Sequence, residues 1–334
     1  MKKVLRWLPG ILISLAAIYI LSKFITGKDL VNAFRSFTWV DILVILLLNI
    51  LSFIARALGW RNLLEGVSIK QAFLIVNEGY LFNNLIPRSG EIVRTLLVSG
   101  FTRISAFQVA SSVVVERALD IVIAAAMFLL TLPFVVEMRW VKPIACVLFV
   151  CFLMAIVFMV ILARHSESVK KWLAASNIHS EFIKEKIFPK FGSILDGLAT
   201  LKNPVKFAKS VFWILCSWVC WTSLLFFGIT RITGRIPLLW GIFTQGILAL
   251  GIALPSAPAS LGVYEGTMVA ALTVFGIDQS AALSIALVLH FVQIIVTSFF
   301  GIYGLMVQGQ SISTLMDRIR IRRDTPSEKL NGEK

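Results

Sequence analysis

The chain has 334 residues, of which 58% are hydrophobic and 15% charged, and its mean hydropathy is +0.87. Soluble domains average about 45–50% apolar and about 25% charged residues, so this composition excludes an ordinary soluble domain and indicates a membrane protein. The formal net charge of +14 resides in basic clusters that flank apolar runs, which is typical of cytoplasmic loops and argues against nucleic-acid binding.

The apolar runs predict an all-α fold, a polytopic bundle of transmembrane helices. Full spans are expected where a run approaches or exceeds the roughly 18 apolar residues of a bilayer-crossing helix, namely near 7–25, 41–60, 110–135, 143–163, 210–230 and 280–308. The first run has the basic start of a signal peptide, but no small-residue cleavage site follows it, so we expect an uncleaved span. Arg56 lies near the end of its span, where its side chain can snorkel to the interface.

Two further apolar segments are interrupted by proline and glycine. Segment 71–98 is broken at Pro87, and segment 236–276 is broken at Pro255, Pro258 and Gly262. Paired broken segments in the two halves of a transporter often form its binding site. We therefore expect two re-entrant segments that dip into the bilayer from opposite faces. An inverted repeat would relate them, and a chance similarity is the alternative.

The basic flanks predict the topology. The N-terminus, the amphipathic insert 164–209 and the C-terminal tail are all expected on the cytoplasmic side of a cytoplasmic (inner) membrane. The expected organisation is one multi-pass transmembrane domain over residues 1–309, which contains the insert, and a basic polar tail over 310–334.

The break in the first segment carries the most informative charges. Pro87 disfavours a continuous helix, so Ser89 is expected to cap a new helix that starts at Gly90, with Glu91 in its first turn. A helix N-terminus inside the membrane favours an anion such as a phosphate, and Arg88 and Arg94 add charge and bidentate hydrogen bonding. The alternative is an interfacial loop with snorkelling arginines.

Charged residues at the start of the 110–135 span predict an ion-pair network. Glu116 and Asp120 share a helix face, and Arg117 can pair with Asp120. Charges near bilayer depth are costly unless paired, so we expect them to face the interior and pair with partners such as Arg94. The alternative is an interfacial cluster that merely ends the span.

The second half offers fewer titratable groups. Ser260 can cap the helix after the second break, and Glu265 lies in its first turn, where a carboxylate is favoured. Glu265 could pair with Arg94 or Arg117, or act as a protonatable coupling group. His290 is more often a hydrogen-bonded packing residue than a ligand in such a setting.

No catalytic motif stands out, and no metal site or cofactor is expected. The cysteines lie inside apolar runs without a Cys-x-x-Cys pair, so they read as small buried hydrophobic residues.

At these residues the sequence resembles the transmembrane, flippase-like region of lysylphosphatidylglycerol synthases. The resemblance rests on ordered motifs: Pro87-Arg88-Ser89-Gly90-Glu91 with Arg94, Glu116-Arg117 with Asp120, Pro255 to Pro258, Leu261-Gly262-Val263-Tyr264-Glu265, and His290. It implies the movement or handling of a phospholipid or polyprenyl-linked lipid. Ala259 stands where the family often has glycine, and the few residues after Gln310 leave no room for the aminoacyl-transferase domain of full-length synthases, so lysine transfer is not expected.

The leading hypothesis is a lipid translocase that binds an anionic headgroup between its two halves. The headgroup site would comprise Arg88, Ser89, Gly90, Arg94 and Arg117. The charge or coupling network would comprise Glu91, Glu116, Asp120, Glu265 and His290. The rivals are a membrane enzyme acting on a polyprenyl-phosphate lipid and an accessory subunit of a lipid-synthesis complex. Membrane lipids are the expected partners, and a homo-oligomer or a lipid-synthesis enzyme is an open alternative.

Overall fold

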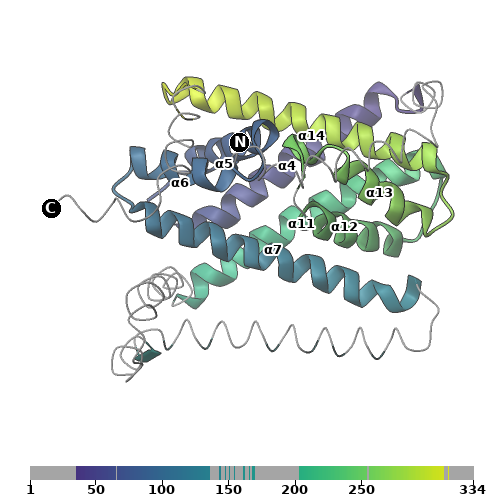
Figure 1. The fold of residues 1–334 in the computed structure, drawn as a ribbon, viewed down its shortest axis with the longest axis horizontal. Helices are drawn as coiled ribbons and strands as arrows, with labels where there is room; N and C mark the ends of the chain where they lie inside the picture. The colour runs from purple at the N-terminus through teal and green to yellow at the C-terminus, as the bar shows by residue number, and fades with distance from the viewer. Residues whose placement is uncertain are drawn as a thin grey trace, which may run out of the picture.

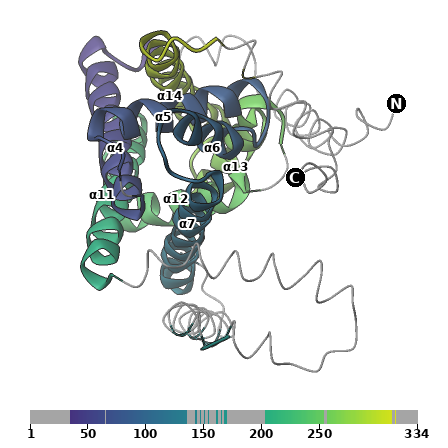
Figure 2. The same cartoon turned by 90° about the vertical axis from the view of Figure 1, so that its left-hand side faces the viewer.

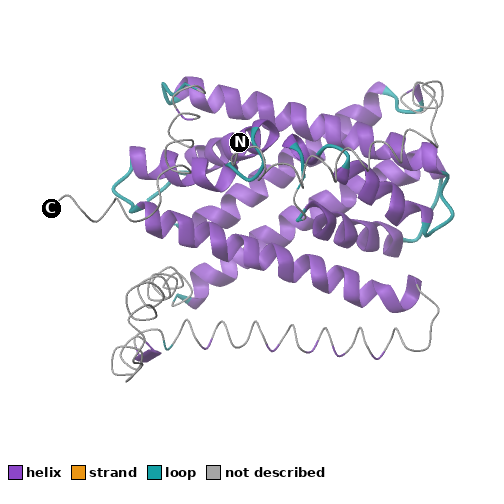
Figure 3. Cartoon of the chain, in the orientation of Figure 1, coloured by secondary structure: helices purple, strands orange, loops and turns teal. Residues whose placement is uncertain are grey.

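The computed structural model describes residues 35–64, 66–135, 203–253 and 256–311, together with isolated positions between 143 and 169 and Leu315. In this part of the chain every regular element is a helix (Figure 3). The expected spans 7–25 and 143–163, the insert up to residue 202, Pro255 and the tail beyond Leu315 lie wholly or mostly outside the described residues.

Long apolar helices form the frame of the bundle. Four of them have the length and hydropathy to cross a membrane, and they are α4 (Trp39–Leu63), α7 (Ala106–Val135), α11 (Pro204–Thr233) and α14 (Gln279–Val307). They confirm the spans expected near 41–60, 110–135, 210–230 and 280–308. The protein is therefore a multi-pass, all-helical membrane protein.

Exposed and buried residues on α4 are distributed as the lipid environment requires. Leu43, Leu47 and Leu51 recur every fourth residue, lie on one helix face and are about half exposed. Asn49 and Arg56 on the same helix are buried. An apolar outer face, with the few polar side chains turned toward the mainly apolar interior, is expected where the outer face contacts lipid tails.

Helices α4 and α11 pack antiparallel along most of their length (Figure 2). At one end, the Arg231 Nε donates to the Asp41 carboxylate at 2.7 Å. Asp41 also forms a capping box with Thr38, accepting its backbone N–H at 2.7 Å, so one carboxylate starts α4 and ties it to α11. At the other end, Ser210 Oγ donates to the Gly59 carbonyl at 2.8 Å, and a side chain on Gly59 would collide with α11.

Both broken segments fold as pairs of shorter helices, which confirms the interruptions expected from the sequence (Figure 1). The first pair is α5 (Ile69–Leu85) and α6 (Gly90–Phe101), and the second is α12 (Leu238–Ile252) and α13 (Val263–Thr273), with the short turn η3 (Pro258–Ser260) between them. Within each pair the two helices pack on each other.

The pairs start at opposite ends of the bundle and meet at their breaks. Helix α5 follows the end of α4, and α12 follows the end of α11, which runs antiparallel to α4. The Arg88 Nη2 donates to the Ala253 carbonyl at 2.5 Å, joining one break to the other. The turn η3 also packs on α5. Residues far apart in sequence therefore come together between the long helices.

Candidate functional site

The first break is built by residues on both sides of Pro87. Helix α5 ends with Ile86 in an extended conformation, and Arg88 adopts a left-handed backbone with φ of 56°. A left-handed backbone costs a residue with a Cβ about 1–2 kcal/mol. In this conformation the Arg88 guanidinium donates to the carbonyl of Ala253 in the other broken segment.

The cap of α6 differs from the one expected. Ser89 occupies the position before Gly90, but its hydroxyl makes no cap hydrogen bond to α6. It donates instead to the carbonyls of Phe82 and Ile86, at 2.8 and 2.7 Å, and so closes the end of α5. The expectation that Ser89 caps α6 is therefore wrong. The Asn83 Oδ1 accepts the Gly90 N–H at 2.8 Å and takes that role.

The second break is capped by Glu265. Its Oε2 accepts the N–H of Gly262 at 2.7 Å, and Gly262 has φ of 80°, which suits glycine. Ser260, expected as the cap, bonds with the Ser256 hydroxyl at 3.2 Å instead. Ala259 has φ of 54°, so this alanine sits in a left-handed conformation, which glycine adopts more readily.

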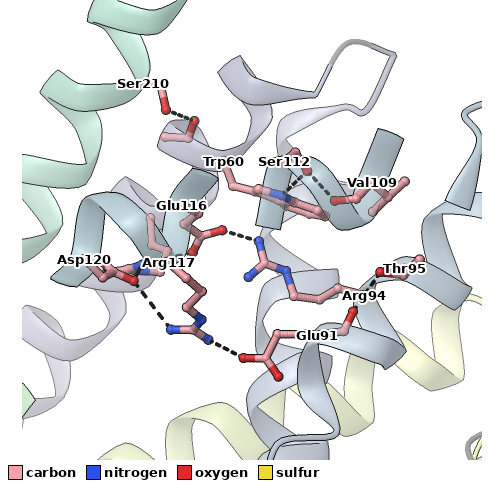
Figure 4. Close-up of polar contacts among 12 residues, drawn as sticks. Trp60, Glu91, Arg94, Thr95, Val109, Ser112, Glu116, Arg117, Asp120 and Ser210 are labelled. Atoms are coloured by element: carbon pink, nitrogen blue, oxygen red, sulfur yellow. Dashed lines mark hydrogen bonds and ion pairs between the residues drawn. The ribbon is translucent and has the colours of Figure 1, made fainter. Parts of the chain in front are cut away.

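A buried ion-pair network joins α4, α6 and α7, and Figure 4 shows its contacts between α6 and α7. Glu116 accepts from Arg56 at 2.9 Å and from Arg94 at 2.5 Å, and all three side chains are almost completely buried. Arg56 also bonds both oxygens of Asp120 at 2.8 Å, which is the bidentate geometry that arginine favours. Arg56 therefore does not snorkel to the interface, as its place in the sequence suggested.

Aromatic rings cover the buried guanidinium groups. The Arg94 guanidinium lies 4.0 Å from the centroid of the Trp60 ring, and the Arg56 guanidinium lies 4.6 Å from that of Trp221. The Trp60 Nε1 in turn donates to Ser112 on α7 at 3.0 Å. These contacts fix the planes of both arginines and add cation–π attraction.

The network extends outward through Arg117. Its guanidinium lies 3.1 Å from Glu91 on α6 and 3.5 Å from Asp120 on α7 (Figure 4). The Arg117 and Glu91 side chains are each more than a third exposed, in contrast to Arg94 and Glu116. The expected pairing of these charges is confirmed. The ion pairs around Glu116 are buried, whereas the pair between Arg117 and Glu91 is partly exposed.

A second titratable pair lies across the site. The His290 Nδ1 is 2.6 Å from the Glu265 Oε1, and the Tyr264 ring stacks on the imidazole with centroids 4.0 Å apart. Of the partners considered for Glu265, neither Arg94 nor Arg117 is the one observed. The carboxylate thus both caps α13 and orients the histidine.

A cavity of about 540 Å³ opens between the two breaks and is lined by residues of both halves. Six of the site residues expected from the sequence line this cavity: Pro87, Arg88, Glu91, Arg117, Asp120 and His290. Ser89, Gly90, Arg94 and Glu116 are buried behind these residues and are absent from the lining. Of the breaking residues, Pro258 and Gly262 shape the second turn without lining the cavity.

Several site residues were missed by sequence reasoning. Asn83, Tyr80 and Trp218 line the cavity, and Trp218 donates its Nε1 to Asp120 at 3.0 Å. Trp218 carried no signal, since a tryptophan in an apolar span usually packs against neighbours or marks an interface. Asn83 had a weak one, because a polar Asn83-Asn84 pair just before a proline break is unusual in an apolar segment.

Comparison with known proteins agrees with these motifs. Residues 7–301 match the family described as the lysylphosphatidylglycerol synthase TM region. No curated protein matches the chain significantly. Since the match covers most of the 334 residues, the chain belongs to the lysylphosphatidylglycerol synthase transmembrane-region family of integral membrane proteins.

Proposed function

We propose that the protein binds the anionic headgroup of a phospholipid or polyprenyl-linked lipid in the cavity between its two breaks and moves that headgroup across the bilayer. The headgroup phosphate would contact Arg88 and Arg117, which line the cavity. Arg94, which lies behind the lining, would support the site by holding Glu116.

The main observation in support of this proposal is that Arg88 has no counter-charge in the part of the chain that the structure describes. This arginine is an exposed cation on the cavity wall, and among the described residues no carboxylate lies within ion-pair distance of it. Its guanidinium donates instead to a neutral backbone carbonyl, that of Ala253. A guanidinium without a counter-charge in a membrane cavity favours an anionic ligand.

The wider charge distribution supports an anion as well. The arginines of the network and the cavity outnumber the carboxylates that pair with them by one: Arg56, Arg88, Arg94 and Arg117 against Glu91, Glu116 and Asp120. Glu265 is engaged by His290. A single phosphate negative charge would balance the surplus.

We further propose that the two broken segments are re-entrant, entering from opposite faces, and that an inverted repeat relates them. The opposite starting points of α5 and α12 and the contact between Arg88 and Ala253 support this arrangement. In such a fold a headgroup would reach the cavity from one side and leave on the other while its tails stayed in lipid.

Lipids that co-purify with the protein would test the binding site. Native mass spectrometry of the wild-type protein should show a bound phosphate-containing lipid, and Arg88→Ala should lose it. Arg61→Ala is the matched control, because Arg61 also donates to a backbone carbonyl, that of Val67 at 2.9 Å, yet does not line the cavity. An unchanged lipid complement in Arg88→Ala would contradict the proposal.

A second candidate function is an enzyme that acts on a polyprenyl-phosphate lipid. The observation in its favour is His290, which lines the cavity with its imidazole oriented by Glu265, as a general base commonly is. Incubation with polyprenyl-phosphate substrates should then give a product of altered mass, and His290→Gln should abolish it while lipid still binds. Recovery of every bound lipid unchanged would exclude the enzyme.

A further inference from the structure

Glu78 is a buried carboxylate outside the cavity and the ion-pair network. It lies on α5 with no exposed surface and faces α14 at Gly304. A side chain on Gly304 would overlap the Glu78 carboxylate, and one on Gly301 would come within 3.0 Å of the Asn77 carbonyl. The two glycines therefore let α5 approach α14 closely enough to enclose the acid.

Among the described residues no ion pair reaches Glu78, and neither of its carboxylate oxygens accepts a hydrogen bond of normal geometry. Gln308, at the end of α14, is the neighbouring polar side chain; its amide N–H group is the donor nearest to Glu78, and its own buried Oε1 lacks a donor. The site thus holds three acceptor oxygens without a well-formed hydrogen bond, two on Glu78 and one on Gln308. One proton on Glu78 would supply a further donor and remove the cost of burying an unpaired charge.

The charged groups on the helices around Glu78 are already engaged. On α4 and α6, Arg56 and Arg94 pair with Glu116. On α14, His290 pairs with Glu265. In the described part of the chain no Arg, Lys or His lies within ion-pair distance of Glu78, so no positive charge there stabilises the ionised form.

The place of Glu78 links it mechanically to the cavity. Asn83 and Asn84 near the end of α5, and Gln293 on α14, line the cavity. Asn84 also donates to Thr297 on α14 at 3.1 Å. A motion that reshapes the cavity by shifting α5 against α14 would open the interface that encloses Glu78. An acid opened to water ionises, and it takes up a proton again on closure.

We propose that Glu78 is a proton-binding site, protonated while α5 and α14 are closed and deprotonated when they separate, and that it couples proton movement to headgroup movement. The coupling rests on the proposed function, whereas the protonation does not. A packed interface gains little stability from an acid without a counter-charge, since leucine would fill the same space without a desolvation cost. This makes a functional role the better explanation of the residue.

Infrared spectroscopy of the whole protein in lipid tests the protonation directly. The wild-type protein at neutral pH should show the carbonyl stretch of a protonated carboxyl group, shifted by deuterium exchange, and Glu78→Gln should lose that band. Asp278→Asn is the control, since Asp278 is an exposed cap of α14 whose pKa is held below its usual value by a hydrogen bond from Ser280. It should change only the ionised-carboxylate band. Absence of a band that depends on Glu78 would overturn the proton site, whatever lipid the protein binds.

A transport measurement tests the coupling. In proteoliposomes of wild-type protein, an imposed pH gradient should change the rate of phospholipid headgroup movement by about 5- to 150-fold, the range of ordinary coupling energies. Glu78→Gln mimics the protonated acid, so it should bind lipid as the wild type does and lose the response to the gradient. A full response in this variant would overturn the coupling. Loss of lipid binding in Arg88→Ala with an intact carboxyl band would concern only the headgroup site.

Discussion

At the scale of single residues, the sequence indicates which charged residues must form ion pairs but does not identify their partners. The crowding of Glu116, Arg117 and Asp120 in an apolar run predicts a network because isolated charges at that depth are too costly. The chief partner of Asp120 is Arg56, 64 residues away on another span. No local spacing encodes such a contact, since it depends on how the α4 and α7 surfaces meet.

Substitution of Arg94 distinguishes a residue that supports the site from one that binds the headgroup directly. Arg94→Ala should lower the free energy of unfolding by about 3–5 kcal/mol, because it strands Glu116 in a buried site beside Arg56 alone. Adding Glu116→Gln should restore part of the loss. Thermal unfolding in detergent measures both variants. A stable Arg94→Ala protein that has lost its lipid would show instead that Arg94 contacts the headgroup.

Arg88 allows backbone strain to be separated from ligand binding. Its φ of 56° suits glycine, so Arg88→Gly should be about 1–2 kcal/mol more stable than Arg88→Ala, which keeps the strain. Both variants should lose the bound lipid equally, because both lack the guanidinium. Unfolding and lipid content are measured on the same preparations. Lipid retained by Arg88→Gly would mean that backbone shape, and not charge, holds the ligand.

At the scale of elements, the breaks could be predicted but their caps could not. Proline at residue 87 and glycine at residue 262 interrupt helices by removing a donor or permitting a left-handed backbone, and both effects are local. The capping side chain is a choice among Ser, Asn and Glu residues of similar capability. Ser89 does not cap α6, because its hydroxyl donates to a carbonyl near the end of α5. The Asn83 side chain accepts the Gly90 N–H instead.

The α5–α6 contact gives a prediction with an internal control. A side chain on Gly90 would overlap the Gly79 carbonyl and approach Asn83, so Gly90→Ala should destabilise the protein by about 1–3 kcal/mol and disturb the cavity. Gly100→Ala lies on the same helix with nothing within 4 Å, and should be neutral or up to about 1 kcal/mol more stable. Equal unfolding temperatures for the two variants would contradict the close approach.

At the scale of the whole molecule, four of the expected spans and both interruptions followed from hydropathy and proline placement. Their arrangement did not, because lipid-facing and interior residues are both apolar, and the hydrophobic pattern therefore carries little information on neighbours. The meeting of Arg88 with Ala253 could be suggested only by analogy with transporters whose broken segments form a central site.

Orientation in the membrane remains a prediction of the basic flanks. If the N-terminus is cytoplasmic, the start of α5 faces the cytoplasm and the end of α11 faces outside. In a cysteine-free background, Lys70→Cys should react with an impermeant thiol reagent only from the cytoplasmic side, and Arg235→Cys only from the outside, since both positions are exposed. Labelling of both from one side would refute opposite entry of the broken segments.

The most direct test of headgroup movement is an assay in proteoliposomes. A phospholipid labelled on its headgroup should cross the bilayer faster with wild-type protein than in empty vesicles, and be recovered chemically unchanged. Arg88→Ala should slow the crossing by about tenfold or more, because a hydrogen bond to a charged group is worth about 1.5–3 kcal/mol. Arg61→Ala should cross at the wild-type rate. Wild-type protein that moves no lipid, or an Arg88→Ala variant as fast as wild type, would contradict headgroup passage through this cavity.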